Sequence, residues 1–318
     1  MSYIKSGKMG LYLRMVGDSF AKASENVYAH YCSLDSFIVF LNDYIEGKKI
    51  KRRPLTYSGR YDKNIVETPY VTFFASNLTF LNDRKEFDLG KNKVLEHMNS
   101  IPENELNKEI FVSCFCSDSD SLTQWKYYGK NSGLAVVFDT ENVLINYYDD
   151  ADEDASCKSD DGDMVFDPRE VLYKDYDKTI DKMLSLYSSG VQKASENDIA
   201  QVVIPYIKDE YFEDEHESRI ALYNIKSEDE KPLSHSNYRV SSNKIIPYLK
   251  MKMFYKDDSC KLPIKSITIG PGDDQDLIME AVCNILSPMN DYDELSNGDR
   301  IIKKLDIRIH KSSCPFKG

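Results

Sequence analysis

The apolar run LAVVF at residues 134–138 predicts the centre of the fold. Uninterrupted apolar residues of this kind are typical of a strand that is buried on both faces. The run IFVSCFC at residues 110–116 predicts a second strand, and IKSITI at residues 264–269 predicts a third that ends before Gly270. These runs therefore predict a sheet at the core of the protein.

Helices are expected between the strands. Ser33 or Asp35 can cap a helix that continues to Ile45, with apolar residues at helical spacing, and Gly47 follows its end. Further helical segments are predicted after a turn at residues 82–86 and at residues 122–128, 177–212 and 275–286. Further strands are predicted at residues 27–31, 70–74, 171–173, 219–225 and 245–254. Because helices and strands do not alternate strictly, the order favours an α+β fold over a doubly wound parallel sheet.

Length and charge limit the class of protein. The chain has 318 residues and 41% hydrophobic residues, which excludes wholesale disorder and suits one elaborated domain over residues 1–318. Residues 149–163 are rich in Asp and Glu and predict a flexible acidic insertion. The net charge of −12 repels nucleic acid, so any RNA contact must be local. Residues 48–53 (KKIKRR) are expected to form a basic loop, which is either such a contact or an ordinary exposed loop.

The cysteines indicate a reducing environment. There are seven, an odd number without a regular framework, and this favours a cytoplasmic protein without disulfides. Cys114 and Cys116 are interpreted as thiols of the core, because a zinc site would need a second pair of ligands. No metal site is expected. The sequence shows neither a secretion signal nor an apolar stretch of membrane-spanning length, so no membrane association is predicted.

The stretch EHESR at residues 215–219 is the best candidate for chemistry. If the chain passes from a helix into a strand here, Glu215, Glu217 and Arg219 share a face, because alternate residues of a strand point the same way. Two carboxylates beside one arginine form a site with tuned pKa values. The alternatives are a solvated edge strand with a surface ion pair, a glycosidase and a magnesium nuclease.

Several motifs occur in an order that resembles a large bacterial family. They are YAHYCSL at 28–34, LNDRKE at 81–86, VSCFC at 112–116 with Trp125, Tyr128 and Gly129, Lys208 with EHESR at 215–219, and ITIGP at 267–271. That family is catalogued as a domain of unknown function, and its members are often associated with abortive infection and phage defence. The resemblance covers most of the chain, but the family name implies no activity.

A more distant likeness to another family implies an activity. His30 and Tyr31 with the helix that follows are similar to the first motif of ADP-ribosyltransferases, VSC at 112–114 to their middle strand, and EHE at 215–217 to their Glu-x-Glu motif. The middle motif departs from the Ser-Thr-Ser form of that family. The likeness implies an ADP-ribosyltransferase-like split β-sheet core with helical insertions, and NAD as the substrate.

The same likeness implies roles for individual residues. Glu217 would be catalytic, and Glu215 would orient or deprotonate the acceptor. The residues assigned to NAD binding are His30, Tyr31, Ser33, Ser113 and Arg219. Tyr31 is also interpreted as a core aromatic, together with Trp125 and Tyr128, and residues 82, 83 and 86 as a helix cap with first-turn charges.

The resemblance leads to two hypotheses. The first is an NAD-dependent ADP-ribosyltransferase toxin of phage defence that modifies RNA or protein and is held by an antitoxin and a chaperone. The second is a non-enzymatic sensor or interaction module of a defence system, in which Glu215, Glu217 and Arg219 form only a structural ion network.

Overall fold

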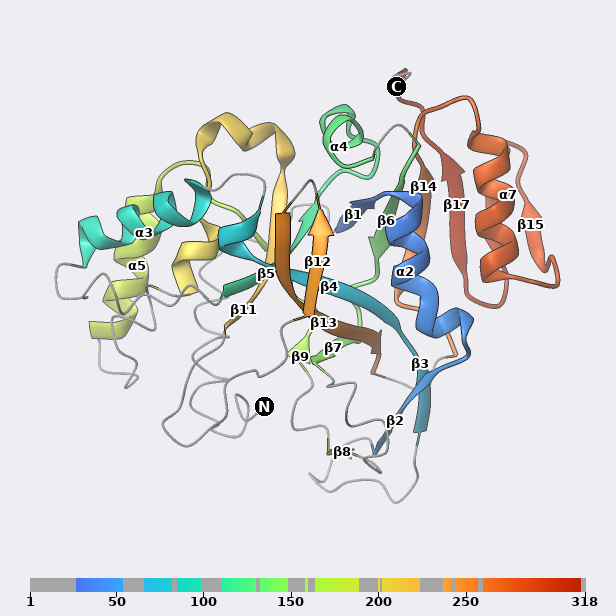
Figure 1. Cartoon of the computed structure of the whole chain (residues 1–318), viewed down its shortest axis with the longest axis horizontal. Coiled ribbons are helices and arrows are strands. Elements are labelled where there is room, and N and C mark those ends of the chain that lie inside the picture. The colour runs from blue at the N-terminus through green and yellow to red at the C-terminus, as the bar shows by residue number, and fades with distance from the viewer. Residues whose placement is uncertain are drawn as a thin grey trace. The chain divides into compact units, whose positions relative to one another are not determined.

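The computed structural model describes residues 27–53, 66–81, 85–98, 110–129, 132–147, 158–159, 164–188, 200, 202–223, 237–241, 244–256 and 260–315. These residues form helices and a mixed sheet with parallel and antiparallel strand pairs (Figure 1). The predicted α+β class is therefore confirmed. The closer likeness to the ADP-ribosyltransferase core stays a prediction.

The chain divides into two compact units, each made of several stretches. Unit 1 comprises Met1–Ala23, Phe74–Cys114 and Pro168–Lys250, and unit 2 comprises Ser24–Phe73, Phe115–Asp167 and Met251–Gly318. Three strands contribute residues to both units: β4 (Val71–Asn77), β5 (Ile110–Cys116) and β13 (Lys244–Tyr255). The expectation of one elaborated domain stays a prediction.

Unit 1 contains two longer helices, α3 (Lys85–His97) and α5 (Tyr176–Ser188). Its shorter elements are η1 (Leu78–Phe80), β10 (Arg169–Glu170), η5 (Ile204–Tyr206), η6 (Glu210–Glu215), β11 (Glu217–Tyr223) and β12 (Asn237–Ser241). β11 pairs with β10 in antiparallel register and also with β5, while β12 pairs with β13. β11 is therefore paired on both edges.

The core of unit 1 joins α3 and α5 to the segment around η5. Apolar side chains from these elements form it, among them Phe87, Val94, Ile180, Met183 and Ile204. Gly90 is required in α3, because a Cβ at this position would lie 2.6 Å from the carbonyl oxygen of Ile204. This close approach holds the middle of α3 beside the segment that leads to Lys208.

The described residues of unit 2 form the helices α2 (Leu34–Ile45), α4 (Leu122–Tyr127) and α7 (Gln275–Leu286). Its strands are β1 (Ala29–Cys32), β2 (Lys49–Arg53), β3 (Val66–Pro69), β6 (Leu134–Phe138), β7 (Val143–Tyr147), β8 (Lys158–Ser159), β9 (Met164–Val165), β14 (Ile264–Ile269), β15 (Tyr292–Glu294), β16 (Arg300–Ile302) and β17 (Ile307–Lys311). α7 packs along β14 and β17 (Figure 1).

β6 lies inside the sheet of unit 2, where the strand order is β15-β16-β17-β14-β6-β1-β5. It pairs in antiparallel register with β1 on one edge and β14 on the other, so that Val136 lies opposite both His30 and Ile267. All five residues of β6 are buried. The prediction of a central strand buried on both faces is confirmed.

Several short elements differ from the sequence prediction. The basic run at residues 48–53 is largely the strand β2 and not a loop, because it pairs with β3 and Glu67 lies opposite Lys51. Residues 171–173 are not a strand; β10 ends at Glu170, and Leu172 makes an isolated bridge to Ile207. The strands β7, β12 and β15 to β17 were not predicted. Most of the acidic segment 149–163, and the turn residues 82–84, lie outside the described residues.

Candidate functional site

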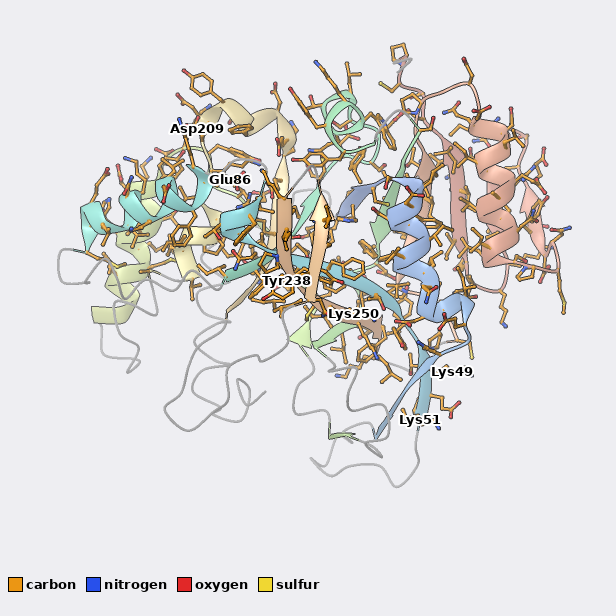
Figure 2. All side chains as sticks on the ribbon, in the orientation of Figure 1. Lys49, Lys51, Glu86, Asp209, Tyr238 and Lys250 are labelled. Atoms are coloured by element: carbon orange, nitrogen blue, oxygen red, sulfur yellow. The ribbon has the colours of Figure 1, made fainter. Side chains whose placement is uncertain are left out.

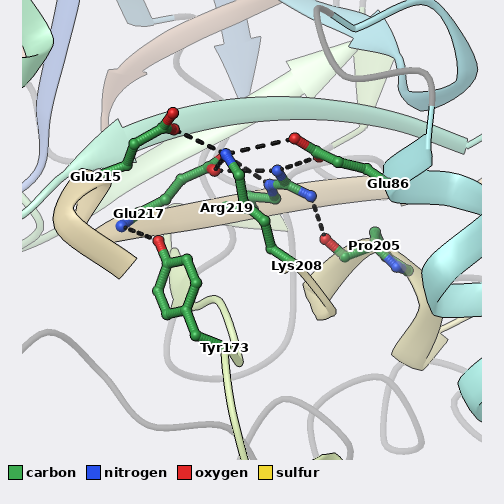
Figure 3. Close-up of polar contacts among 7 residues, drawn as sticks. All are labelled: Glu86, Tyr173, Pro205, Lys208, Glu215, Glu217 and Arg219. Carbon is green, nitrogen blue, oxygen red and sulfur yellow. Dashed lines mark hydrogen bonds and ion pairs between the residues drawn. The ribbon is translucent and has the colours of Figure 1, made fainter. Parts of the chain in front are cut away.

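The Glu-x-Glu pair lies where a 3₁₀ helix turns into a strand. η6 begins after Asp209, whose side chain caps it, and ends at Glu215. His216 then adopts a left-handed φ of 44°, and β11 begins at Glu217. The predicted passage from helix to strand is confirmed, and the turn brings Glu215 and Glu217 to the same cation, Lys208 (Figure 3).

Five charged side chains form what we call the glutamate cluster: Glu86, Lys208, Glu215, Glu217 and Arg219. The Nζ of Lys208 donates to Oε2 of Glu215 and to Oε2 of Glu217, each at 2.7 Å, and lies 3.4 Å from Oε1 of Glu86. Arg219 donates from Nε to Oε1 of Glu217 and from Nη2 to Oε2 of Glu86, each at 2.6 Å. Two cations therefore hold three carboxylates (Figure 3).

The glutamate cluster is buried. Arg219 is 1% exposed, Lys208 is 3% exposed, and Glu215, the most exposed member, is 8% exposed. Charges at such depth interact strongly because little water screens them, and each needs its partners to offset its desolvation. The alternative of a solvated edge strand with a surface ion pair is therefore wrong, since β11 is paired on both edges and its charges are enclosed.

The environment moves the pKa values of the two motif glutamates in opposite directions. Burial alone raises the pKa of Glu217, but the charges of Arg219 and Lys208 outweigh it and lower that pKa to about 2. Burial raises the pKa of Glu215, and Lys208 offsets this only in part. Glu217 is thus held as an anion, while Glu215 is the carboxyl that takes up a proton more readily.

Glu86 was not predicted to belong to this site. The sequence predicts a first-turn helix charge at this position, and Glu86 does lie in the first turn of α3. Its carboxylate, however, is 5% exposed and bonded to Arg219, which is 133 residues away in the chain. The only sequence signal was its place in the LNDRKE motif at residues 81–86.

Cys114, and not Ser113, provides the hydrogen bond from β5 to Glu217. The hydroxyl of Ser113 donates to the carbonyl oxygen of Phe74 at 2.9 Å. Successive side chains of a strand point to opposite faces, so Cys114 faces the glutamate cluster and its thiol bonds to Glu217. Ser113 therefore does not bond to Glu217, and its contact with NAD stays a prediction.

His30, Tyr31 and Ser33 belong to unit 2, whereas Ser113, Glu215, Glu217 and Arg219 belong to unit 1. The ring of His30 lies 6.1 Å from that of Phe115, between centroids. Tyr31 packs edge-on against Trp125, and its hydroxyl donates to the carbonyl of Asp118 at 2.9 Å. Tyr31 and Trp125 are buried, which confirms their interpretation as core aromatics. That all seven predicted residues form one site stays a prediction.

Ser33, one of the two residues that the sequence offered as the cap, caps α2. Its Oγ accepts a hydrogen bond from the backbone N–H of Ser36 at 3.3 Å. We expect Ser33→Ala to lower the free energy of unfolding by about 1 kcal/mol, because an unsatisfied N–H remains at the helix start. The shift of the urea midpoint measures this, and Ser36→Ala, which keeps that N–H and removes only the hydroxyl contact with Ser33, serves as the control. Equal midpoints for Ser33→Ala and wild type would show that the cap contributes no stability.

The basic run is partly neutralised by acidic neighbours. Lys49 and Lys51 project from β2 (Figure 2) and both lie within 4 Å of Glu67, at 3.9 and 3.7 Å between charged atoms. Lys48 pairs with Asp43 and Glu46. Exposed pairs of this kind contribute little to stability, and both β2 lysines remain about half exposed or more, at 49% and 67% for their side chains. The role of this run as an RNA contact stays a prediction.

The described cysteines are reduced thiols. Cys116 is buried and Cys114 is half-buried, and neither forms a disulfide, in agreement with their interpretation as core thiols. Within the described ranges, no three His, Cys, Asp or Glu side chains are grouped to hold a metal ion. None of the helices in the described part of the chain is long and apolar enough to cross a membrane.

Comparison with known proteins gives one partial match. Residues 124–220 match the model of a family described as a protein of unknown function (DUF2971). This span is under a third of the chain, and it includes Lys208, Glu215, Glu217 and Arg219 but not Glu86 or His30. Neither the curated proteins nor the solved structures gave a match. The match therefore connects four of the five cluster residues to a family whose function is unknown.

Proposed function

We propose that this protein is an NAD-dependent ADP-ribosyltransferase that acts as a toxin in bacterial phage defence. The observation that supports this proposal is the buried Glu-x-Glu pair itself, whose two carboxylates lie on one ammonium at 2.7 Å each and whose pKa values are displaced in opposite directions. A pair of carboxyls whose environments separate their pKa values in this way is suited to two different roles. One stays ionised throughout, and the other exchanges a proton.

The proposed reaction uses these two roles. The glycosidic bond between nicotinamide and the ribose breaks, nicotinamide leaves with the bonding electrons, and positive charge develops on the ribose. The anion of Glu217 stabilises that charge. The acceptor nucleophile, on RNA or protein, then forms a bond to the same ribose carbon, and its proton passes to Glu215. His30, Tyr31, Ser33, Ser113 and Arg219 are the proposed NAD-binding residues, as the family likeness implies.

The first test uses NAD labelled in its adenylate phosphate. Purified wild type, Glu215→Gln and Glu213→Gln are incubated with lysates of uninfected and phage-infected bacteria, and label is followed in protein, RNA and free ADP-ribose. We expect wild type to label one macromolecular class. Glu215→Gln should transfer about 10²-fold more slowly because the acceptor keeps its proton. Glu213→Gln is the matched control, since Glu213 lies on the same η6 turn but pairs with Lys174 at the surface.

The labelled products distinguish transfer of ADP-ribose, hydrolysis of NAD and the absence of both reactions. Label transferred by wild type and by Glu213→Gln, but hardly by Glu215→Gln, supports the transferase. Release of free ADP-ribose alone indicates NAD hydrolysis. Absence of both products in all lysates contradicts the proposal.

A second candidate is a non-enzymatic sensor or interaction module of a defence system. One observation favours it: the two oxygens of Glu217 have about four acceptor positions. Arg219 donates from Nε and Nη2, Lys208 donates from Nζ, and the Cys114 thiol also bonds to this carboxylate. A saturated carboxylate of this kind is what a purely structural network requires. NAD turnover by the wild type would exclude it as the whole function.

The proposed toxin activity implies partners that inhibit it and a location where its acceptors occur. An unrestrained transferase would harm its host, so we propose an antitoxin and a chaperone that keep it inactive before infection. A cytoplasmic location fits its acceptors and its free thiols in the described residues. Co-purification of the chain with the products of adjacent genes, with and without infection, tests these partners.

A further inference from the structure

Lys208 occupies a fixed position in the backbone of unit 1. Its N–H donates to the carbonyl of Leu172 at 3.0 Å, and its own carbonyl accepts a hydrogen bond from the hydroxyl of Tyr176 at 2.7 Å. The preceding residue, Ile207, forms the bridge to Leu172. The Lys208 side chain therefore starts from an anchored Cα, as the side chain of a positioning residue must.

The ammonium group of Lys208 links the three glutamates. It bonds to Glu215 and Glu217 at equal distances of 2.7 Å and lies 3.4 Å from Glu86. Arg219, by contrast, bonds to Glu217, to Glu86 and to the carbonyl of Pro205. Lys208 is thus the cation of the cluster that contacts both motif glutamates (Figure 3).

We infer that Lys208 is the positioning residue that holds Glu215 and Glu217 in fixed relation for the transfer reaction. Its compact ammonium, with three N–H donors, bridges two carboxylates whose oxygens would otherwise repel each other. Lys208 has this role only if the proposed transferase activity exists, because Glu215 and Glu217 are the groups through which it acts.

Other groups around the two glutamates bear on the effect of removing Lys208. Facing them are Glu86 from α3, Cys114 from β5, Tyr173 from the segment after β10, and Arg219 from β11. The Tyr173 hydroxyl accepts the backbone N–H of Glu217 at 2.9 Å. None of these contacts uses the Lys208 side chain, so replacing it removes the ammonium and deletes none of them directly.

Lys208→Met and Lys208→Arg test the inference with labelled NAD. Methionine keeps an unbranched, similarly long side chain without charge, and we expect it to lower kcat about 100-fold, with a smaller change in KM. Because Lys208 lowers the pKa values of both glutamates, the acid limb of the pH–rate profile should move to higher pH. Lys208→Arg keeps the charge and is expected to restore the acid limb but only part of kcat, since the planar guanidinium cannot bridge the carboxylates equally.

The matched control is Lys174→Met, which removes a surface lysine paired with Glu213 of the same η6 turn. Circular dichroism checks that each variant is folded. If Lys208→Met fails to fold, the kcat and the pH–rate profile of Lys208→Arg test the inference instead. A folded Lys208 variant with the wild-type kcat and the wild-type acid limb overturns the inference and leaves the transferase standing. Absence of NAD turnover in the wild type overturns both.

Discussion

Replacement of Arg219 by methionine is expected to lower the free energy of unfolding by about 3–5 kcal/mol, one of the largest effects of any single substitution in this protein. The guanidinium is 1% exposed and bonds to Glu217, Glu86 and the carbonyl of Pro205. Without it, three buried carboxylates, those of Glu86, Glu215 and Glu217, share the single charge of Lys208, and none of them can regain water. The loss of partners, more than the loss of the arginine itself, causes the destabilisation.

Urea unfolding followed by circular dichroism measures this effect. Arg308→Met is the control, because Arg308 pairs with Asp299 and its side chain is 52% exposed; we expect a change below about 1 kcal/mol. The double variant Arg219→Met/Glu86→Gln should recover part of the unfolding free energy that Arg219→Met loses, since one unpaired carboxylate is removed together with the cation. Equal midpoints for Arg219→Met and Arg308→Met would show that the cluster contributes no more than the partly exposed Arg308–Asp299 pair.

The long apolar elements of the fold were predictable from the sequence. The observed bounds of β5, β6, β14 and α7 coincide with the runs at residues 110–116, 134–138, 264–269 and 275–286. Such segments bury most of their own residues, so their local pattern and their tertiary environment favour the same structure.

The short strands were not predictable because their pairing, and not their composition, determines them. β2 is a lysine-rich segment that becomes a strand through β3, and β10 is two charged residues that pair with β11. β15 and β16 are exposed or half-buried over most of their length, and they carry little apolar pattern. The partners of β2 and β10 lie elsewhere in the sequence, whereas β15 and β16 pair with each other across a short turn.

The candidate site was predictable from the sequence only for the residues of β11 and of the turn that leads into it. Glu217 and Arg219 share a face of β11 as alternation predicts, and Glu215 joins them through the left-handed turn at His216. The contribution of Glu86 depends on how α3 packs against η5, which no local pattern encodes. Lys208 precedes the motif in the sequence, yet its role follows only from the folding of η6 between it and Glu215.

Acid is expected to destabilise wild type through Glu217. The pKa of this carboxyl falls from its ordinary value of 4.5 in the unfolded chain to about 2 in the folded protein. A lowered folded-state pKa gives a stabilisation that is present above the unfolded value and is lost as the pH falls through the folded one. The stabilisation by Glu217 is therefore lost between about pH 5 and pH 2. For a pKa displacement of this size, the unfolding free energy falls by about 3 kcal/mol.

Glu217→Gln isolates this effect from that of other carboxyls. Glutamine does not titrate, so the difference in unfolding free energy between wild type and Glu217→Gln should shrink as the pH falls from 5 to 2. Glu215 acts in the opposite sense, because its raised pKa favours the folded state at low pH, but it is present in both proteins and its contribution largely cancels. Urea midpoints at half-unit pH intervals measure the difference, with Glu213→Gln as the surface control. A constant difference across this window would show that Glu217 is not held as an anion, and would remove the charge on which its proposed catalytic role depends.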